Sequence, residues 1–366
     1  MGKSLTLYKT KSIVKNSRNS ALMPSAFNMM LWILLIFAAL AEFTYQTKGA
    51  HSCPDLCSCS FSLLGAEVEC SQGSLHYFPE DGLPSNTTKL SIQSTNLSSI
   101  TARHLRAVPL LKHLQLYYTN LTSLPADLLK DVPHLNKLDL TGNRLVDLLP
   151  NVFNHASLRS LWLRNNLIEE VDAEWFSHNS SLTELDLSTN HLTAIPAALL
   201  QKMPNLEDLD LSDNNLRDIQ SDDLKNLHRL ERLNLLGNKL RSLKPTTFTH
   251  NLKLSHLFLN QNQLREVPGC LLKGLEHLEL LMLNQNQLQS LPFGLLDGRK
   301  SSFRVTLSGN PWVCDKRMEY LWKWLMVHVD NVLFLEDVTC AGPESLTQRQ
   351  CISLTETELG LDMIED

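Results

Sequence analysis

An aliphatic residue recurs every 24 residues through the middle of the chain, with a single step of 23, and this period restricts the fold more than any other feature. A second aliphatic residue follows two positions later in each of ten units, and asparagine follows five positions later in the last eight units. Ten units in one register exclude chance. The first aliphatic position of each unit, here named the anchor, is occupied by Leu90, Leu114, Leu138, Leu161, Leu185, Leu209, Leu233, Leu257, Leu281 and Val305.

The spacing within each unit predicts a strand followed by a turn. Aliphatic residues two positions apart point into the core, while the residues between them face outward. We expect the asparagine to be buried, because its amide can satisfy backbone groups of the turn. A second apolar column lies fifteen positions after the anchor and marks a return segment. Since each unit buries only one face against its neighbours, the chain is predicted to form an α/β leucine-rich-repeat solenoid, curved, with a concave parallel β-sheet.

The same period predicts the domain organisation. The repeats, about ten in number, span residues 87–309. Because terminal units of a solenoid need covering, we expect a Cys-rich N-terminal cap over residues 53–86 and a C-terminal cap over residues 310–353. A short linker over residues 42–52 precedes the first cap, and an acidic tail over residues 354–366 follows the second.

The N-terminal part of the chain is typical of a secretory signal. Residues 29–41 form one apolar run, too short for a bilayer span of about 20 residues. Basic residues precede the run and a small-x-small pattern ends at Ala41, so we predict a signal peptide over residues 1–41. An uncleaved anchor is the weaker alternative because the run is short, and starts at Met23 or Met29 stay open. The mature protein is expected to be extracellular, without a membrane span.

Charge and motif content argue for binding rather than catalysis. The formal net charge is −6, and no basic stripe follows the first 19 residues of the sequence, so nucleic acid is not the expected partner. No nucleophile elbow or metal-ligand spacing occurs, and the 13 histidines are scattered. A matrix protein would carry glycosaminoglycan attachment sequences or acidic tyrosine tracts, which are absent. We expect no enzyme activity, no cofactor and no metal.

The residues beside the paired aliphatic positions define the concave surface, and two groups on it are candidate ligand-binding residues. An exposed apolar cluster on a strand face predicts an interface, although such side chains can instead only cover their neighbours. The acidic group admits a solvated face, a complement to a basic partner or a calcium site, and regular strand carboxylates without a loop motif disfavour calcium. The candidates are Trp162, the acids Glu184, Asp186, Asp208 and Asp210, and the apolar cluster Leu236, Phe258, Leu280 and Met282.

Four sequons predict N-glycosylation of the secreted chain, at Asn86, Asn96, Asn120 and Asn179. All four lie in the first half of the chain. Carbohydrate would therefore shield the N-terminal part and leave the apolar cluster open.

The cysteines gather at the two caps. Four lie between residues 53 and 70, and in an oxidising compartment this cluster indicates disulfides rather than zinc. Cys314 and Cys340 are the C-terminal pair that spans a helix-like stretch, which predicts a Cys314–Cys340 disulfide. Three states stay open for Cys270 and Cys351: paired with each other, free, or linked to another chain.

The flanks of the repeats carry a family likeness. The 24-residue pattern, the four-cysteine N-terminal flank and the sequence Asn-Pro-Trp-x-Cys-Asp over residues 310–315 resemble extracellular leucine-rich-repeat proteins. Residues 308–315, the helix motif ending at Leu325 and residues 340–344 resemble the leucine-rich alpha-2-glycoprotein family, from about Cys53 to Leu361. The wider class has a second cysteine where Lys316 stands, and this narrower family lacks it too.

This resemblance implies more than the pattern alone. It implies the disulfides Cys53–Cys59 and Cys57–Cys70, by the alternating pairing of similar flanks. It also implies a secreted glycoprotein whose partner is an extracellular receptor, growth factor or secreted enzyme. The family's role would be modulation of transforming growth factor beta receptor signalling and angiogenesis, with binding of cytochrome c. The alternatives are a plasma inhibitor of a secreted enzyme such as phospholipase, or a matrix or immune recognition protein.

Overall fold

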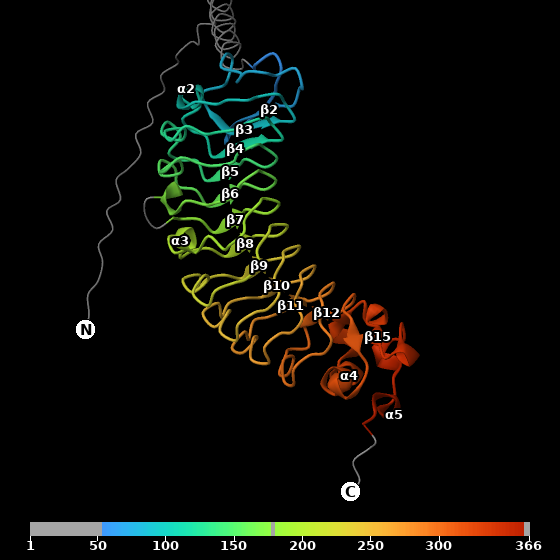
Figure 1. Ribbon diagram of the computed structural model, residues 1–366. Helices are drawn as coiled ribbons and strands as arrows, with labels where there is room; N and C mark the ends of the chain where they lie inside the picture. Colours follow the sequence, from blue (N-terminus) through green and yellow to red (C-terminus); the bar gives the residue numbers. More distant parts are fainter. Residues whose placement is uncertain (1–52, 177–179, 362–366) are drawn as a thin grey trace, which may run out of the picture. The chain divides into compact units, whose positions relative to one another are not determined.

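Each repeat contributes one short strand to a single long sheet (Figure 1). The computed structural model describes residues 53–176 and 180–361; the expected signal peptide and linker lie outside these ranges. In the described part of the chain the sheet has 13 strands. They are β1 Ser58–Ser62, β2 Gly65–Cys70, β3 Thr87–Gln93, β4 His113–Tyr117, β5 Lys137–Asp139, β6 Ser160–Trp162, β7 Glu184–Asp186, β8 Asp208–Asp210, β9 Arg232–Asn234, β10 His256–Phe258, β11 Leu280–Met282, β12 Arg304–Thr306 and β14 Val332–Leu333.

The register of the sheet follows the 24-residue period. From β3 to β12 the strands are parallel and each anchor lies opposite the next, as Leu209 lies opposite Leu233. At the N-terminal end β2 is parallel to β3 and pairs with β1 as an antiparallel hairpin. At the C-terminal end β14 is parallel to β12, with Val332 opposite Val305. The sheet thus runs without interruption from one cap to the other.

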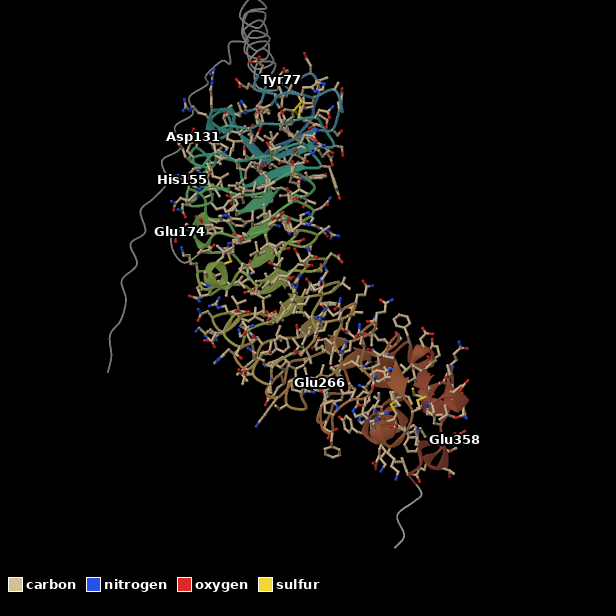
Figure 2. The ribbon with its side chains drawn as sticks, in the orientation of Figure 1. Tyr77, Asp131, His155, Glu174, Glu266 and Glu358 are labelled. Carbon is tan, nitrogen blue, oxygen red and sulfur yellow. A yellow bond between two sulfur atoms is a disulfide. The ribbon has the colours of Figure 1, made fainter. Side chains whose placement is uncertain are left out.

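The return segments close the other side of each repeat. They contain the short helices α2 Ala102–Leu105 and α3 Ala197–Leu200 and the 3-10 turn η1 Ala173–Trp175. Figure 2 shows polar side chains along this edge of the stack, among them Asp131, His155 and Glu174. The apolar column of these segments is buried, as are the anchors, and together they form one continuous core. This arrangement confirms the predicted leucine-rich-repeat solenoid.

A ladder of buried asparagines holds each repeat to the previous one. The Asn190 side-chain amide donates to the carbonyl oxygens of Leu163 in the preceding repeat, at 3.0 Å, and of Leu187 in its own, at 3.1 Å. Its Oδ1 accepts the backbone N–H of Ile168 at 3.0 Å. The same contacts recur in the other repeats from Asn143 to Asn310. The amides therefore satisfy the turn that follows each strand from β5 to β12, as the spacing predicts.

The residue before each ladder asparagine, and before Thr95 and Thr119 at the same position of the first two repeats, has a left-handed backbone, which the sequence pattern does not predict. Three of the ten are glycines, and the others carry side chains of several types. At Gly237, with φ +68°, an added Cβ would lie 2.2 Å from Asp213 Oδ1 of the preceding repeat. The ten positions are Ser94, Tyr118, Gly142, Asn165, Thr189, Asp213, Gly237, Gln261, Gln285 and Gly309. The ladder holds even non-glycine residues in this uncommon conformation.

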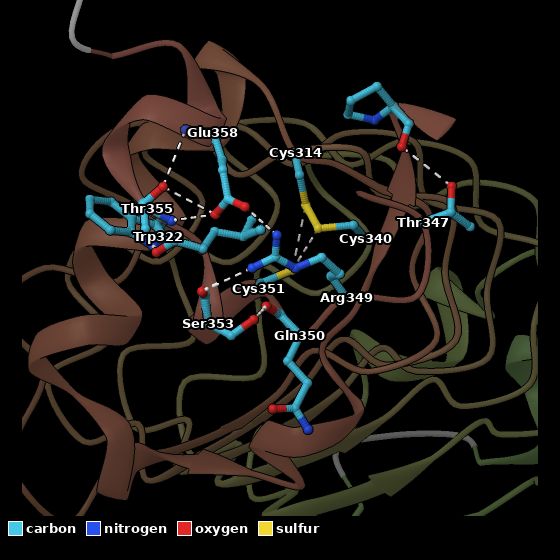
Figure 3. The surroundings of a disulfide bond; sticks show 12 residues. Cys314, Trp322, Cys340, Thr347, Arg349, Gln350, Cys351, Ser353, Thr355 and Glu358 are labelled. Atoms are coloured by element: carbon cyan, nitrogen blue, oxygen red, sulfur yellow. Dashed lines mark hydrogen bonds and ion pairs between the residues drawn. A yellow bond between two sulfur atoms is a disulfide. The ribbon is translucent and has the colours of Figure 1, made fainter. Parts of the chain in front are cut away.

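Disulfides close the two ends of the stack. The structure joins Cys53 to Cys59 and Cys57 to Cys70 around the β1–β2 hairpin, and Cys314 to Cys340 in the C-terminal cap (Figure 3). The C-terminal cap contains the strands β13 Trp312–Val313 and β15 Cys340–Gly342 and the helix α4 Glu319–Val327. Its remaining elements are α5 Glu356–Leu359 and the 3-10 turns η2 Lys316–Met318, η3 Val329–Asn331, η4 Leu335–Asp337, η5 Glu344–Leu346 and η6 Cys351–Ser353.

The C-terminal cap continues past residue 353, so the expected start of an acidic tail at 354 is wrong. The buried Trp322 indole donates to the carbonyl oxygen of Leu354 at 3.1 Å. Thr355 caps α5 by accepting the backbone N–H of Glu358, and Leu359 is buried. Buried leucines between the acidic residues pack this segment against the cap. The acidic composition of the segment led to the prediction of a tail, because composition does not show which leucines are buried. Residues 362–366 lie outside the described residues.

The two cysteines outside the three disulfides are both free. Cys351 is buried, with its Sγ 3.8 Å from that of Cys314 and 4.0 Å from that of Cys340 (Figure 3). Burial raises the pKa of the Cys351 thiol to about 12, so it stays protonated at neutral pH and is a poor nucleophile. Cys270 is exposed on the return segment of the eighth repeat.

The asparagine ladder makes a direct prediction about stability. Replacing Asn214 by alanine leaves the N–H of Leu192 without its partner. It also removes one of the two amide bonds that the carbonyl oxygens of Leu187 and Leu211 each accept, the other coming from Asn190 or Asn238. One unsatisfied buried group costs about 1–3 kcal/mol and the two lost carbonyl bonds add to this, so we expect a loss of roughly 2–4 kcal/mol in the free energy of unfolding, measured by guanidinium denaturation. Asn215→Ala is the control, because among the described residues its side chain has no hydrogen-bond partner. Equal losses in both variants would contradict the ladder.

Candidate binding surface on the concave face

The sheet face opposite the core carries the candidate residues in two adjacent columns. In solenoids of this kind that face is the concave one. The register places Trp162, Asp186, Asp210, Asn234, Phe258 and Met282 side by side in a central column. It places Glu184, Asp208, Arg232, His256 and Leu280 in a second column two residues earlier in each strand. Leu236 lies in the turn after β9.

An acidic hollow lies at the strand starts of β7–β10. Glu184 and Asp208 face it, together with Glu207 and Glu231, which the sequence analysis missed. Glu207 and Glu231 are neighbours on adjacent repeats, since the backbone N–H of Glu231 donates to the carbonyl oxygen of Glu207 at 2.8 Å. They lie two residues before their anchors, at the same 24-residue spacing, which is the signal that could have identified them. The hollow is lined by Thr183, Glu184, Glu207, Asp208, Glu231, Arg232, Ser255 and His256.

Burial in this hollow, with nearby carboxylates as a smaller cause, raises the pKa of Asp208. Burial raises the pKa of Asp208 from 3.8 to about 6, and the nearby carboxylates, Glu184 foremost, add to this effect. The guanidinium of Arg232, whose Nε lies 3.4 Å from Asp208 Oδ2, opposes the shift without cancelling it. The hollow therefore holds an excess of negative charge that a cationic partner would relieve.

Two of the four predicted acids have a structural task. Asp186 Oδ1 accepts the backbone N–H of Ser188 at 2.8 Å, and Asp210 Oδ1 accepts that of Ser212 at 2.9 Å. Asn234 also donates its side-chain amide to Asp210 Oδ2 at 2.8 Å. Such bonds stabilise the turn that ends each strand. Glu184 and Asp208 line the hollow, whereas the central-column acids Asp186 and Asp210 also support turns.

Trp162 joins the two columns. Its half-buried indole donates to Glu184 Oε1 at 2.8 Å, and its strand position lies opposite Asp186. The bond fixes the carboxylate at the edge of the acidic hollow and leaves part of the ring exposed.

The apolar cluster is half-buried rather than exposed, which corrects the sequence expectation. Leu236, Phe258, Leu280 and Met282 are each partly covered. The rings of His256 and Phe258 are nearly parallel, with centroids 6.4 Å apart, so part of the phenylalanine is covered by its neighbour. The cluster is nevertheless continuous, because β10 and β11 pair directly.

Two further apolar residues extend the central column into the C-terminal cap. Leu333 of β14 lies opposite Thr306 of β12 and is 36% exposed, and the next residue, Phe334, is 61% exposed. The sequence period does not include them, because the cap helix α4 separates β14 from β12 in the chain. The pairing of β14 with β12 is visible only in the structure, because the sequence period does not extend to β14.

The predicted glycosylation sites lie away from the apolar cluster. Asn86 precedes β3 and is exposed, and Asn96 is exposed in the turn after β3. Asn120 donates its amide to Asn96 Oδ1 at 3.2 Å, so these two sites lie on the same edge of the stack. Asn179 lies outside the described residues. Within the described ranges no helix has the length and apolarity that a bilayer span requires.

Comparisons with known proteins agree with this architecture. Residues 85–145 and, in overlapping windows, 156–288 match the leucine rich repeat family, together more than half of the chain. A 64-residue stretch is 36% identical to human carboxypeptidase N subunit 2, covering 18% of this chain and 12% of that protein. A 104-residue stretch is 33% identical to rat leucine-rich repeat-containing protein 4, covering 28% of this chain and 15% of that protein.

Among solved structures, human 5T4 (Wnt-activated inhibitory factor 1, trophoblast glycoprotein) is similar with a TM-score of 0.57 and 27% identity. The similarity covers 84% of this chain and 98% of that chain. The chain therefore belongs to the leucine-rich-repeat family, whose members present concave surfaces for binding other proteins.

The raised pKa of Asp208 predicts a pH dependence of stability. Between pH 3.8 and about 6 the folded chain holds a proton on Asp208 that the unfolded chain releases, so this group lowers stability as pH rises through that window. Relative to the parent, Asp208→Asn should gain stability from about pH 4 to pH 6 and level off above. Because the Asp208 side chain is 38% exposed, we expect a gain below about 1 kcal/mol.

The measurement is denaturant unfolding of parent and variant at a series of pH values. Asp218→Asn removes one exposed negative charge outside the hollow and serves as the control. A difference between Asp208→Asn and the parent that stays constant from pH 4 to pH 7 would show that Asp208 is not perturbed in this way.

Proposed function

We propose that this chain is a secreted glycoprotein that binds an extracellular protein through the concave face of repeats five to nine. One observation supports this most: an acidic hollow and a continuous apolar cluster lie side by side on strands β7–β11. Interfaces of high affinity combine apolar anchors at the centre with charged groups that steer the partner.

The chemistry of the surface specifies the kind of partner. Glu184, Glu207, Asp208 and Glu231 line the hollow against the cations Arg232 and, when protonated, His256. A complementary partner presents lysine or arginine side chains to the hollow and an apolar side chain to Phe258 and Met282. Leu333 and Phe334 extend the apolar cluster, so a partner that reaches the C-terminal cap would bury more apolar surface area.

The finer assignment rests on resemblance. The flank motifs support membership of the leucine-rich alpha-2-glycoprotein family, and with it modulation of transforming growth factor beta receptor signalling and of angiogenesis. The similarity to human 5T4, described as a Wnt-activated inhibitory factor, supports a Wnt-pathway protein as a second class of partner. The similarity to carboxypeptidase N subunit 2 supports association with a secreted enzyme as a third.

The experiment measures binding of transforming growth factor beta receptor ectodomains to the secreted chain by surface plasmon resonance. Phe258→Ala should weaken binding by about 2 kcal/mol, roughly 30-fold in Kd, mainly through faster dissociation, as expected for an aromatic anchor. Phe293→Ala is the matched control, because Phe293 is 85% exposed on a return segment away from the sheet. It should leave Kd unchanged within about twofold.

Charge is tested in the same assay. A Glu207→Gln and Glu231→Gln double variant keeps the turn bonds of Asp186 and Asp210 intact and removes two charges from the hollow. We expect slower association and a flatter dependence on salt, with dissociation little changed. The docking site is wrong if the partner binds both Phe258→Ala and the Glu207→Gln, Glu231→Gln double variant as tightly and as fast as the parent.

A further inference from the structure

A row of cations follows the starts of strands β3–β6, at the N-terminal end of the same sheet. The row, here named the basic rim, consists of Lys89, Lys112, Lys137 and Arg159. No basic stripe is visible in the sequence, because these residues lie 22 to 25 positions apart in the chain. The fold brings them together.

Backbone pairing sets the geometry of the basic rim. Lys89 lies opposite His113, which lies opposite Lys137. One residue earlier in each repeat, the backbone carbonyl oxygen of Lys112 accepts the backbone N–H of Asn136 at 2.9 Å. The backbone carbonyl oxygen of Asn136 accepts the backbone N–H of Arg159 at 2.8 Å. Neighbouring strands are about 4.8 Å apart, so four successive strands place the row over about 15 Å.

These cations lack carboxylate partners. Among residues 53–176 and 180–361 none of the four has an ion pair, whereas Lys202 pairs with Glu174 at 2.8 Å. Lys112, Lys137 and Arg159 are exposed, and Lys89 is half-buried. Glu67 of β2 lies opposite Lys89, so the uncompensated positive charge is that of Lys112, Lys137 and Arg159, on a chain whose net charge is −6.

His113 reports the field of these lysines. Burial lowers the pKa of His113, and the charges of Lys137, Lys89 and Lys112 lower it further, while Glu67 on β2 opposes them. Three lysines from different strands thus act on one point of the surface. That convergence is what a shared anionic ligand needs.

Beside the first three cations of the basic rim the surface lacks an apolar anchor. On β6, next to Arg159, the half-buried Trp162 follows in the central column and donates to Glu184 of the acidic hollow. The neighbouring central-column residues are Ser91, Gln115 and Asp139, and Asp139 accepts the backbone N–H of Thr141 at 2.9 Å. Protein interfaces of high affinity need buried apolar side chains at their centre. A polar row of cations instead suits a hydrated, linear polyanion that contacts one cation per strand.

We propose that the basic rim binds a sulfated polysaccharide. The choice of a polysaccharide among polyanions rests on the extracellular placement proposed above. The inference that the rim binds a polyanion rests only on the arrangement of its cations. Sulfate groups carry fixed negative charge and accept hydrogen bonds from lysine and arginine. The acidic hollow begins at β7, next to the end of the rim, so polysaccharide and protein partner occupy successive parts of one sheet.

The test uses the full secreted chain, with N-glycans removed enzymatically because Asn86 lies three residues before Lys89. Immobilised heparin oligosaccharide is the probe. The double variant Lys112→Ala, Lys137→Ala should weaken binding at least about tenfold. It should also reduce the dependence of binding on salt, because fewer cation–sulfate contacts release fewer counterions on binding. Lys253→Ala with Lys273→Ala is the control, because both residues are exposed outside the rim and the change in net charge is the same.

Three further arms locate and classify the interaction. De-N-sulfated heparin should bind more weakly than heparin, and polyglutamate should compete poorly. The His113 resonance should titrate at higher pH in the presence of heparin, because bound sulfates offset the lysine charges. Phe258→Ala should bind heparin as the parent does, which separates this proposal from the protein-binding site.

The proposal is overturned if the parent does not bind heparin, or if rim and control variants lose affinity equally. Polyglutamate competing as well as heparin would instead favour an acidic protein segment as the occupant.

Discussion

The buried asparagine amides are the interaction on which the rest of the structure depends. Each bonds two carbonyl oxygens and one N–H across two repeats, as Asn214 bonds Leu187, Leu211 and Leu192. Without these bonds the turns after strands β5 to β12 would bury unsatisfied backbone groups. The ladder thereby keeps the strands in register, and the register decides which side chains become neighbours on the concave face.

A fixed backbone of this kind leaves the outward positions free to vary. Along the strand starts, the charge changes from the basic rim at β3–β6 to the acidic hollow at β7–β10, although the backbone pairing is the same throughout. The apolar cluster then follows on β9–β11 and continues to Leu333 of β14. Binding chemistry is therefore arranged along the solenoid as successive segments, each made from positions 24 residues apart.

The fold was predictable because its core is periodic. Anchors, return-segment residues and ladder asparagines all recur at fixed spacing, and burial of one face requires that they stack. Three features were not predictable for identifiable reasons. The left-handed position before each asparagine accepts Thr189 and Gln261 as well as glycine, so composition gives no signal. The turn bonds of Asp186 and Asp210 and the partial burial of Phe258 depend on contacts with neighbouring strands. Leu333 joins the sheet after an intervening helix.

Hydroxyl-radical footprinting of the free chain and of its complex with a bound protein partner tests the concave site most directly. Phe258, Met282 and Trp162 are oxidisable side chains on the sheet face, whereas Phe293 and Tyr77 are 85% exposed elsewhere and serve as internal references. The account predicts that oxidation of the sheet residues falls on complex formation while that of the references is unchanged. Protection of Phe293 or Tyr77 with unchanged oxidation of Phe258 and Met282 would contradict it.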